Sequence, residues 1–90
     1  MIGFRFHRGM GLDYKRQGYI YFVCRNFERL SRRDQDAISA CAEEYCGGYA
    51  AAVMRLVTSG DSYQRVAIDH YMSVNTLYRA VTAFYRHFPL

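Results

Sequence analysis

Apolar residues near the C-terminal end of the chain recur with the period of an α-helix. One face of a long helix would carry the residues at i, i+3, i+4, i+7 and i+8, which are Leu77, Ala80, Val81, Phe84 and Tyr85. Ser73 is placed to cap this helix. A shorter helix before it would be capped by Ser62 and would turn Val66, Ala67 and His70 inward. Met72 is the apolar residue in the corner between them, so the pattern predicts a helix-turn-helix over about residues 62–88.

Three more helices are predicted upstream of this pair. A helix over about residues 19–30 follows from the spacing of Ile20, Val23, Cys24, Phe27 and Leu30. The next should begin at Ser31, which has Asp34 three residues on, close to a capping box, and should end at Gly47 and Gly48. Its inward residues would be Ile38, Cys41, Ala42 and Tyr45. An alanine-rich helix over about residues 49–58 would turn Val53, Met54 and Val57 inward.

These elements predict an all-α protein, a single small domain of about five helices with the helix-turn-helix at its C-terminal end. The first 18 residues differ from the rest, because Gly3, Gly9, Gly11 and Gly18 disfavour a helix there. We therefore expect a basic, glycine-rich arm over residues 1–18, mobile or extended, and a helical domain over residues 19–90.

The positive charge of the chain lies in its N-terminal third. Formal net charge is +4, and all but one of the 12 basic residues are arginine. Residues 1–30 hold six basic and two acidic residues, whereas basic and acidic residues balance over residues 31–90. The planar fork of arginine can grip two phosphate oxygens, so a basic arm ahead of a helix-turn-helix is suited to phosphate or minor-groove contacts. A solvated, solubilising terminus would have the same composition.

The outward face of the last helix carries groups that suit the edges of bases in the DNA major groove. These candidate base-reading residues are Ser73, Val74, Asn75, Thr76, Tyr78, Arg79 and Thr82. Arg79 could grip a guanine through two hydrogen bonds, and such a pair contributes about 1–3 kcal/mol of discrimination. Asn75 could pair with adenine, or it could support the helix cap instead. A solvated polar face on an ordinary surface helix remains the alternative.

Contacts to the DNA backbone are expected from a second group of residues. Ser62, Gln64 and Arg65 begin the first helix of the motif, where side chains and backbone N–H groups often meet a phosphate. Arg86, at the far end of the last helix, is a further candidate. His70 faces inward and is better explained as a packed core histidine.

Several residues resemble those of known regulators. They are Leu30-Ser31, Ala37-Ile38, Leu56-Val57-x-x-Gly60, the spacing Ala67, Met72-Ser73, Leu77, and finally Ala80-Val81 with Phe84, Tyr85 and Phe88. From Leu30 onward the chain resembles small plasmid-encoded repressors of the TrfB/KorA type and, more distantly, fimbrial operon regulators of the PapB type. The resemblance implies a sequence-specific, dimeric transcriptional regulator, most naturally a repressor of plasmid, phage or fimbrial genes, that reads an operator with the second helix of its motif.

Two departures from the family pattern shape our expectations. Tyr71 stands where many such motifs carry the glycine of the turn, and tyrosine is costly in left-handed backbone geometry. We therefore expect a corner more helical than usual. The plasmid repressors dimerise through a separate C-terminal segment that this chain does not show. A homodimer would have to use the helix over residues 19–30 or the aromatic group Phe84, Tyr85 and Phe88.

Other classes of function have less support. There is no glycine-rich phosphate loop, no His-Glu-x-x-His motif and no Cys-x-x-Cys pair, so we expect neither an enzyme nor a metal site, and no cofactor or small-molecule substrate. The three cysteines are expected to be reduced thiols, and with neither a membrane span nor an export signal in view we expect a cytoplasmic protein, at the nucleoid when bound to DNA. The alternative function is a protein-interaction module with a tyrosine-rich surface of Tyr45, Tyr49, Tyr63, Tyr71, Tyr78 and Tyr85, which would bind the transcription machinery or another regulator.

Overall fold

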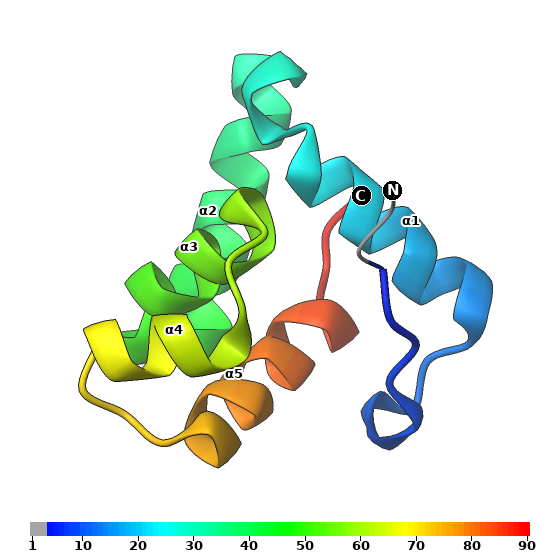
Figure 1. The fold of residues 1–90 in the computed structure, drawn as a ribbon. Coiled ribbons are helices and arrows are strands. Elements are labelled where there is room, and N and C mark those ends of the chain that lie inside the picture. The colour runs from blue at the N-terminus through cyan, green and yellow to red at the C-terminus, as the bar shows by residue number, and fades with distance from the viewer. Residues whose placement is uncertain (1–3) are drawn as a thin grey trace.

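Helices make up all the regular secondary structure of residues 4–90, which are the residues that the computed structural model describes. In chain order they are η1 (Arg8–Met10), α1 (Tyr14–Arg25), η2 (Phe27–Arg29), α2 (Arg32–Cys46), η3 (Gly47–Tyr49), α3 (Ala50–Ser59), α4 (Tyr63–Asp69) and α5 (Val74–Arg86), where η marks a single 3-10 turn. Figure 1 shows α5 between α1 on one side and the α2–α3 pair on the other, with α4 packed beside α5. The prediction of an all-helical, single small domain is confirmed.

Hydroxyl and carboxylate caps explain where most of these helices begin. The side chains of Ser31, Ser62 and Ser73 each accept a hydrogen bond from the backbone N–H three residues on, at 3.2, 3.1 and 3.0 Å. All three caps were predicted from the sequence. At its other end α2 stops at Gly47, which has a positive φ of 53°, also as predicted.

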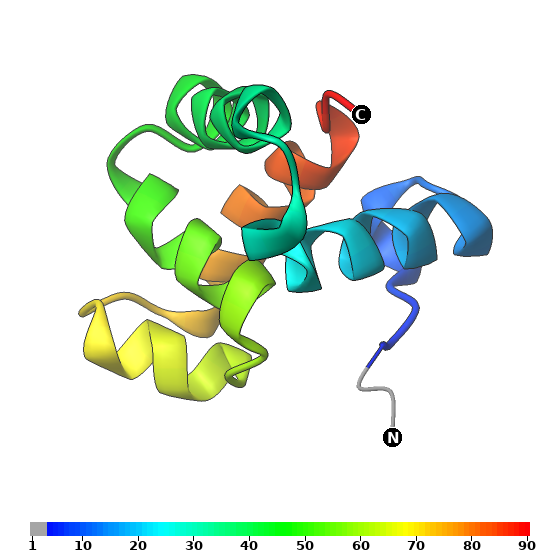
Figure 2. The same ribbon diagram turned by 90° about the horizontal axis from the view of Figure 1, so that it is seen from above.

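The core forms around the apolar face of α5. All five of its predicted inward residues are buried, and Leu77 and Phe84 are fully inaccessible to solvent. They meet buried side chains from every other helix, which include Ile20, Ile38, Ala42, Val53, Val66 and Ala67. Figure 2 shows α5 crossing the middle of the molecule with the other helices arranged around it. The apolar face of α5, which repeats with a period of 3.6 residues, is therefore buried against several other helices.

The inward face of α2 differs from the predicted one at its last turn. Tyr45 is 42% exposed, and Cys46 is buried in its place. The Tyr45 ring lies flat on the His87 ring, with centroids 3.8 Å apart, at the edge of the core. The smaller Cys46 fits beneath α5, where its thiol donates to the carbonyl oxygen of Ala80 at 3.2 Å. Met54 of α3 is likewise only half-buried, and Leu56 is buried instead.

The N-terminal region is more ordered than the composition indicates. The first long helix begins at Tyr14 and not near residue 19, because Asp13 caps it by accepting from the N–H of Arg16 at 2.8 Å. Gly18 therefore lies inside α1, and the preceding residues 4–13 are packed on the domain, with Met10 fully buried. The expectation of a mobile or extended arm does not describe residues 4–18. Residues 1–3 lie outside the described range.

One residue in the corner between α4 and α5 adopts left-handed backbone geometry. Tyr71 has a φ of 56°, the only positive φ at a non-glycine residue in the described chain. Backbone hydrogen bonds close the corner, from the N–H of Tyr71 to the carbonyl of Ile68 (3.2 Å) and from the N–H of Met72 to the carbonyl of Ala67 (3.0 Å). The expectation of a more helical corner is wrong, since tyrosine adopts the geometry that glycine would supply.

Replacement of Tyr71 by glycine should stabilise the protein. The tyrosine side chain is 97% exposed, so its removal costs little packing. Relief of left-handed strain contributes about 1–2 kcal/mol, against about 0.5–1 kcal/mol for the greater freedom of glycine in the unfolded chain. We expect Tyr71→Gly to raise the free energy of unfolding, measured in urea, by up to about 1 kcal/mol. The matched control is Tyr49→Gly, at a half-exposed tyrosine with a φ of −97°, which should destabilise. If Tyr71→Gly were less stable than the original chain, the idea that Tyr71 is strained would be wrong.

Candidate nucleic-acid interface

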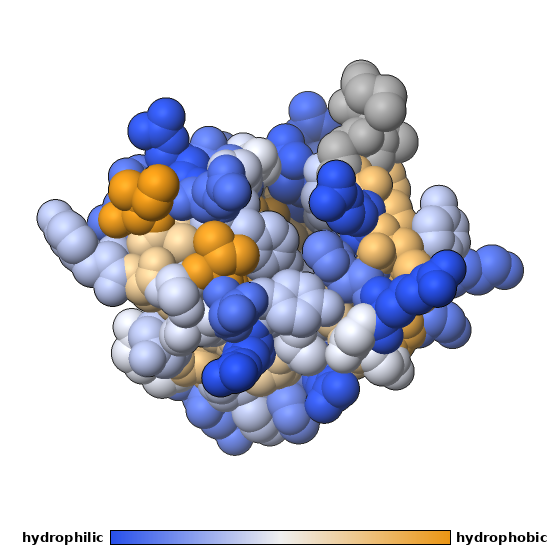
Figure 3. Space-filling view, turned by 60° about the horizontal axis from the view of Figure 1, so that its bottom comes forward, coloured by the Kyte–Doolittle hydropathy of each residue, from blue (hydrophilic) through white to orange (hydrophobic). Residues whose placement is uncertain are grey.

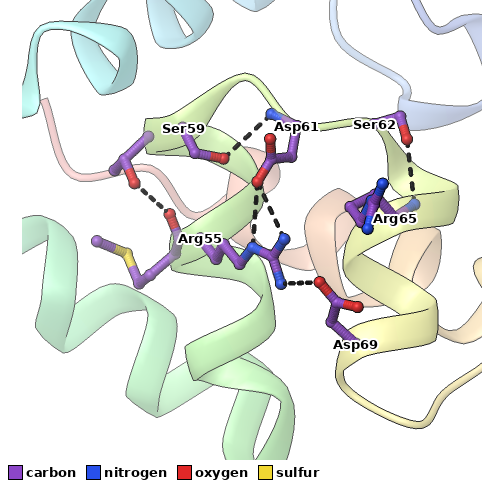
Figure 4. Close-up of polar contacts among 8 residues, drawn as sticks. Arg55, Ser59, Asp61, Ser62, Arg65 and Asp69 are labelled. Atoms are coloured by element: carbon purple, nitrogen blue, oxygen red, sulfur yellow. Dashed lines mark hydrogen bonds and ion pairs between the residues drawn. The ribbon is translucent and has the colours of Figure 1, made fainter.

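A charge network holds α4 against α3. Arg55 of α3 binds Asp61, in the loop before α4, through Nε and Nη2 at 3.2 and 3.1 Å. Its Nη1 lies 2.9 Å from a carboxylate oxygen of Asp69, at the end of α4. Figure 4 shows the guanidinium between the two carboxylates, with the Ser59 hydroxyl accepting from the N–H of Asp61. Because the network joins α3 to the loop before α4 and to the last residue of α4, it sets the orientation of α4 relative to α3.

The first two turns of α5 leave a polar face open to solvent. Ser73, Val74, Asn75 and Arg79 are all exposed, as predicted for candidate base-reading residues. No ion pair or hydrogen bond occupies the Arg79 guanidinium within residues 4–90. Thr76 is half-buried, and its hydroxyl accepts from the Ser73 hydroxyl at 2.9 Å. Figure 3, in which the end of the molecule with α4 and α5 comes forward, shows mostly polar side chains at the centre of this face, with a group of apolar ones on its left and another on its right.

Two of the predicted base-reading residues are turned into the protein. Tyr78 is half-buried, and its ring packs between His7 and Tyr63, with centroids 5.4 and 6.1 Å away. A Cβ at Gly9 would come within 3.1 Å of the Tyr78 hydroxyl, so any other residue there would have to displace the phenol slightly. The Thr82 hydroxyl is buried and has no hydrogen-bond partner among the described residues. The structure therefore does not bring these two side chains together with Asn75 and Arg79.

The predicted backbone-contact residues fall into two groups. Gln64 and Arg65 are exposed on the first turn of α4, beside the capping Ser62, as expected. Arg86 instead donates from Nε to the carbonyl oxygen of Met10 at 2.8 Å. Its guanidinium thus holds the N-terminal segment on α5, a structural role that the sequence pattern did not indicate.

Gln17 is the residue that organises the N-terminal segment, and sequence reasoning missed it. It is fully buried on α1, where its Nε2 donates to the carbonyls of His7 (2.7 Å) and Leu12 (2.9 Å). Its Oε1 accepts from the N–H of His7 at 2.8 Å. Gln17 stands at i, i+3 and i+7 with Ile20 and Cys24, so the inward face of α1 was the available signal.

The ordered segment places its basic residues beside α5. Arg5 and Arg8 are exposed, on either side of His7, whose ring packs on Tyr63 and Tyr78. Burial of the imidazole, followed by the nearby charge of Arg5, lowers the pKa of His7. His7 is therefore neutral at physiological pH, so it does not repel the arginines beside it.

Comparisons with known proteins do not assign the chain to a family. No family model, curated protein or solved structure matches the chain. The resemblance to the TrfB/KorA and PapB regulators therefore stays a prediction from the quoted residues.

The remaining chemistry of the described residues is that of a packed core. The three cysteines are buried and unpaired, and burial raises the pKa of Cys24 to about 12 and that of Cys46 to about 11, so both thiols are neutral. Within residues 4–90 no three potential ligands among His, Cys, Asp and Glu lie close enough to share a metal ion. None of the helices described is both long and apolar enough to span a bilayer.

Proposed function

We propose that the protein is a sequence-specific DNA-binding regulator of transcription, most naturally a repressor, in which α4 and α5 act as a helix-turn-helix. The observation that carries the proposal is the division of α5 into two faces. One face is buried through Leu77 and Phe84, and the other presents to solvent Asn75 and Arg79, whose guanidinium has no partner among residues 4–90. An exposed helix of this kind, held by a packed partner helix, is what enters the major groove.

Electrostatics supports the same surface. Arg65 on α4 and Arg8 in η1 are exposed, and both of these elements contact α5. Two exposed positive charges thus fall on segments adjacent to the proposed reading helix, where neutralised phosphates would release counterions. In this proposal Asn75 and Arg79 read base edges, while Gln64, Arg65 and Arg8 contact the backbone.

The alternative of a tyrosine-rich protein-binding surface has less support. Tyr85 is only 8% exposed, and Tyr63 and Tyr78 pack on each other and on His7. Of the exposed tyrosines that remain, Tyr45 and Tyr49 are near one another, at the end of α2 and in η3, whereas Tyr71 lies in the corner between α4 and α5. The aromatic route to a homodimer also loses support, because Phe84 and Phe88 are buried in the core. For a homodimer on a pseudo-symmetric site, the exposed side of α1 is left as the candidate surface.

Selection of bound sites from random double-stranded DNA tests the function. We expect enrichment of a defined sequence, with affinity that falls steeply as salt is raised. Arg79→Ala should then relax the preference at one base position by about 1–3 kcal/mol without lowering the melting temperature. Arg32→Ala is the matched control, at an exposed arginine in the first turn of α2, which lies at the other end of the molecule in Figure 1. No enriched site and no salt-sensitive binding would refute the proposal.

A further inference from the structure

A cavity of about 460 Å³ lies between the N-terminal segment, α1 and the corner that joins α3 to α4. This volume falls within the range of small-molecule sites. We propose that the cavity binds a small anionic molecule with an aromatic or apolar body. The binding itself does not depend on whether the protein binds DNA.

The floor of the cavity is apolar. Leu56 and Val57 of α3 and Val81 of α5 line it, and all three belong to the buried core. Apolar walls with a few convergent polar groups are the usual composition of a site that encloses most of a small ligand. A phosphate of the DNA backbone would reach the rim but would leave this floor unfilled, so the lining favours a free ligand with a body of its own.

Two arginines give the cavity its charge. Arg5 and Arg25 line it, and neither makes an ion pair with a carboxylate of residues 4–90. The Arg25 guanidinium donates to the Tyr21 hydroxyl at 2.9 Å and lies against Gly60, where a Cβ would come within 2.7 Å of it. Gly60 has a φ of 82°, a left-handed geometry that favours glycine, and its lack of a side chain leaves room for the guanidinium at the cavity. The carboxylate of Asp61, also in the lining, is engaged by Arg55.

Phenolic hydroxyls complete the set of donors. Tyr63 and Tyr85 line the cavity, and their hydroxyls make no hydrogen bond to a described residue. Burial raises the pKa of both tyrosines, so each hydroxyl keeps its proton and can donate it to an anion. Arginine forks and neutral phenols together are suited to a carboxylate or phosphate group.

The cavity is also connected to the proposed reading helix. His7 lines the cavity on one side and packs against Tyr78 of α5 on the other. A bound ligand would therefore contact the segment that covers the middle of α5, which gives it a route to influence DNA binding.

Titration of the purified, ¹⁵N-labelled chain with phenyl phosphate, in the absence of DNA, tests the site. We expect saturable amide shifts for the lining residues, with a dissociation constant of about 1 mM or lower, which is reasonable for a ligand of this size. Inorganic phosphate and benzyl alcohol, which supply the charge and the ring separately, should each bind at least about tenfold more weakly. Equal binding of inorganic phosphate, or no saturable shift with phenyl phosphate, would overturn the proposal.

Variants of the two cavity arginines test which positive charge binds the phosphate group. Arg25→Gln and Arg5→Gln should each weaken phenyl phosphate binding by about tenfold. Arg5 is exposed and outside the helices, so its variant stays informative if Arg25→Gln disturbs the fold. Arg32→Gln, on the first turn of α2, should leave binding unchanged. Unchanged affinity in both cavity variants would overturn the assignment, whereas failure of the DNA selection would leave these measurements unaffected.

Discussion

Phe84→Ala is expected to lower the free energy of unfolding by about 3–5 kcal/mol, the usual cost of removing a buried aromatic ring. Phe84 is fully inaccessible and makes edge-to-face contacts with Tyr85 and Phe88, at centroid distances of 6.3 and 5.7 Å. Stabilities of small domains are about 5–15 kcal/mol, so the variant should be close to unfolding at 37 °C. Urea denaturation followed by circular dichroism measures the loss, and the melting temperature should fall by about 4–8 °C for each kcal/mol.

Two further variants separate packing at Phe84 from other effects on the helices. Phe84→Leu keeps an apolar side chain in the core and should lose clearly less stability than the alanine variant. Ile68→Ala removes a large apolar side chain that is 72% exposed on α4, and it should change stability by less than about 0.5 kcal/mol. A loss below about 1 kcal/mol for Phe84→Ala would mean that α5 is not buried as described.

The buried face of α5 was predictable because its pattern is local and repeated. Leu77, Phe84 and their neighbours recur over three turns, and Ser73 marks the start of the helix, so the period identifies the face without knowledge of its partners. The starts of α2, α4 and α5, set by the caps Ser31, Ser62 and Ser73, were predictable for the same reason, whereas the Asp13 cap that begins α1 was missed. The last turn of α2 was less so, since the choice between Tyr45 and Cys46 depends on the stacking of Tyr45 with His87, far away in the sequence.

The candidate interface was predictable only where nothing else covers α5. Asn75 and Arg79 are exposed as expected, but Tyr78 is covered by a segment that the glycine content marked as a loose arm. One of the hydrogen bonds that hold this segment joins Arg86 to Met10, 76 residues apart. Helical periodicity carries no information about such a contact. The cavity was not predictable either, because its lining comes from four separate stretches of the chain.

Gln17→Leu is expected to release the N-terminal segment from the domain. Gln17 is fully buried, and leucine of similar size would leave two backbone groups without a partner, the N–H of His7 and the carbonyl of Leu12, while the His7 carbonyl would keep only the N–H of Met10 at 3.3 Å. Each buried, unpaired group costs about 1–3 kcal/mol, so hydration of the segment becomes the better alternative. We expect a loss of roughly 2–4 kcal/mol in the free energy of unfolding, with rapid hydrogen exchange at the His7 amide.

Gln35→Leu is the matched control for this release. Gln35 of α2 also donates from Nε2 to two backbone carbonyls, those of Phe27 and Leu30, but it is only half-buried and lies away from residues 4–13. Its replacement should cost less stability and leave the His7 amide protected. On the proposed function, Gln17→Leu should also weaken DNA binding while the base preference set by Arg79 persists, because Arg5 and Arg8 would no longer be held beside α5. Retained protection of His7 in Gln17→Leu would show that packing of Met10 and the Arg86 hydrogen bond suffice to hold the segment.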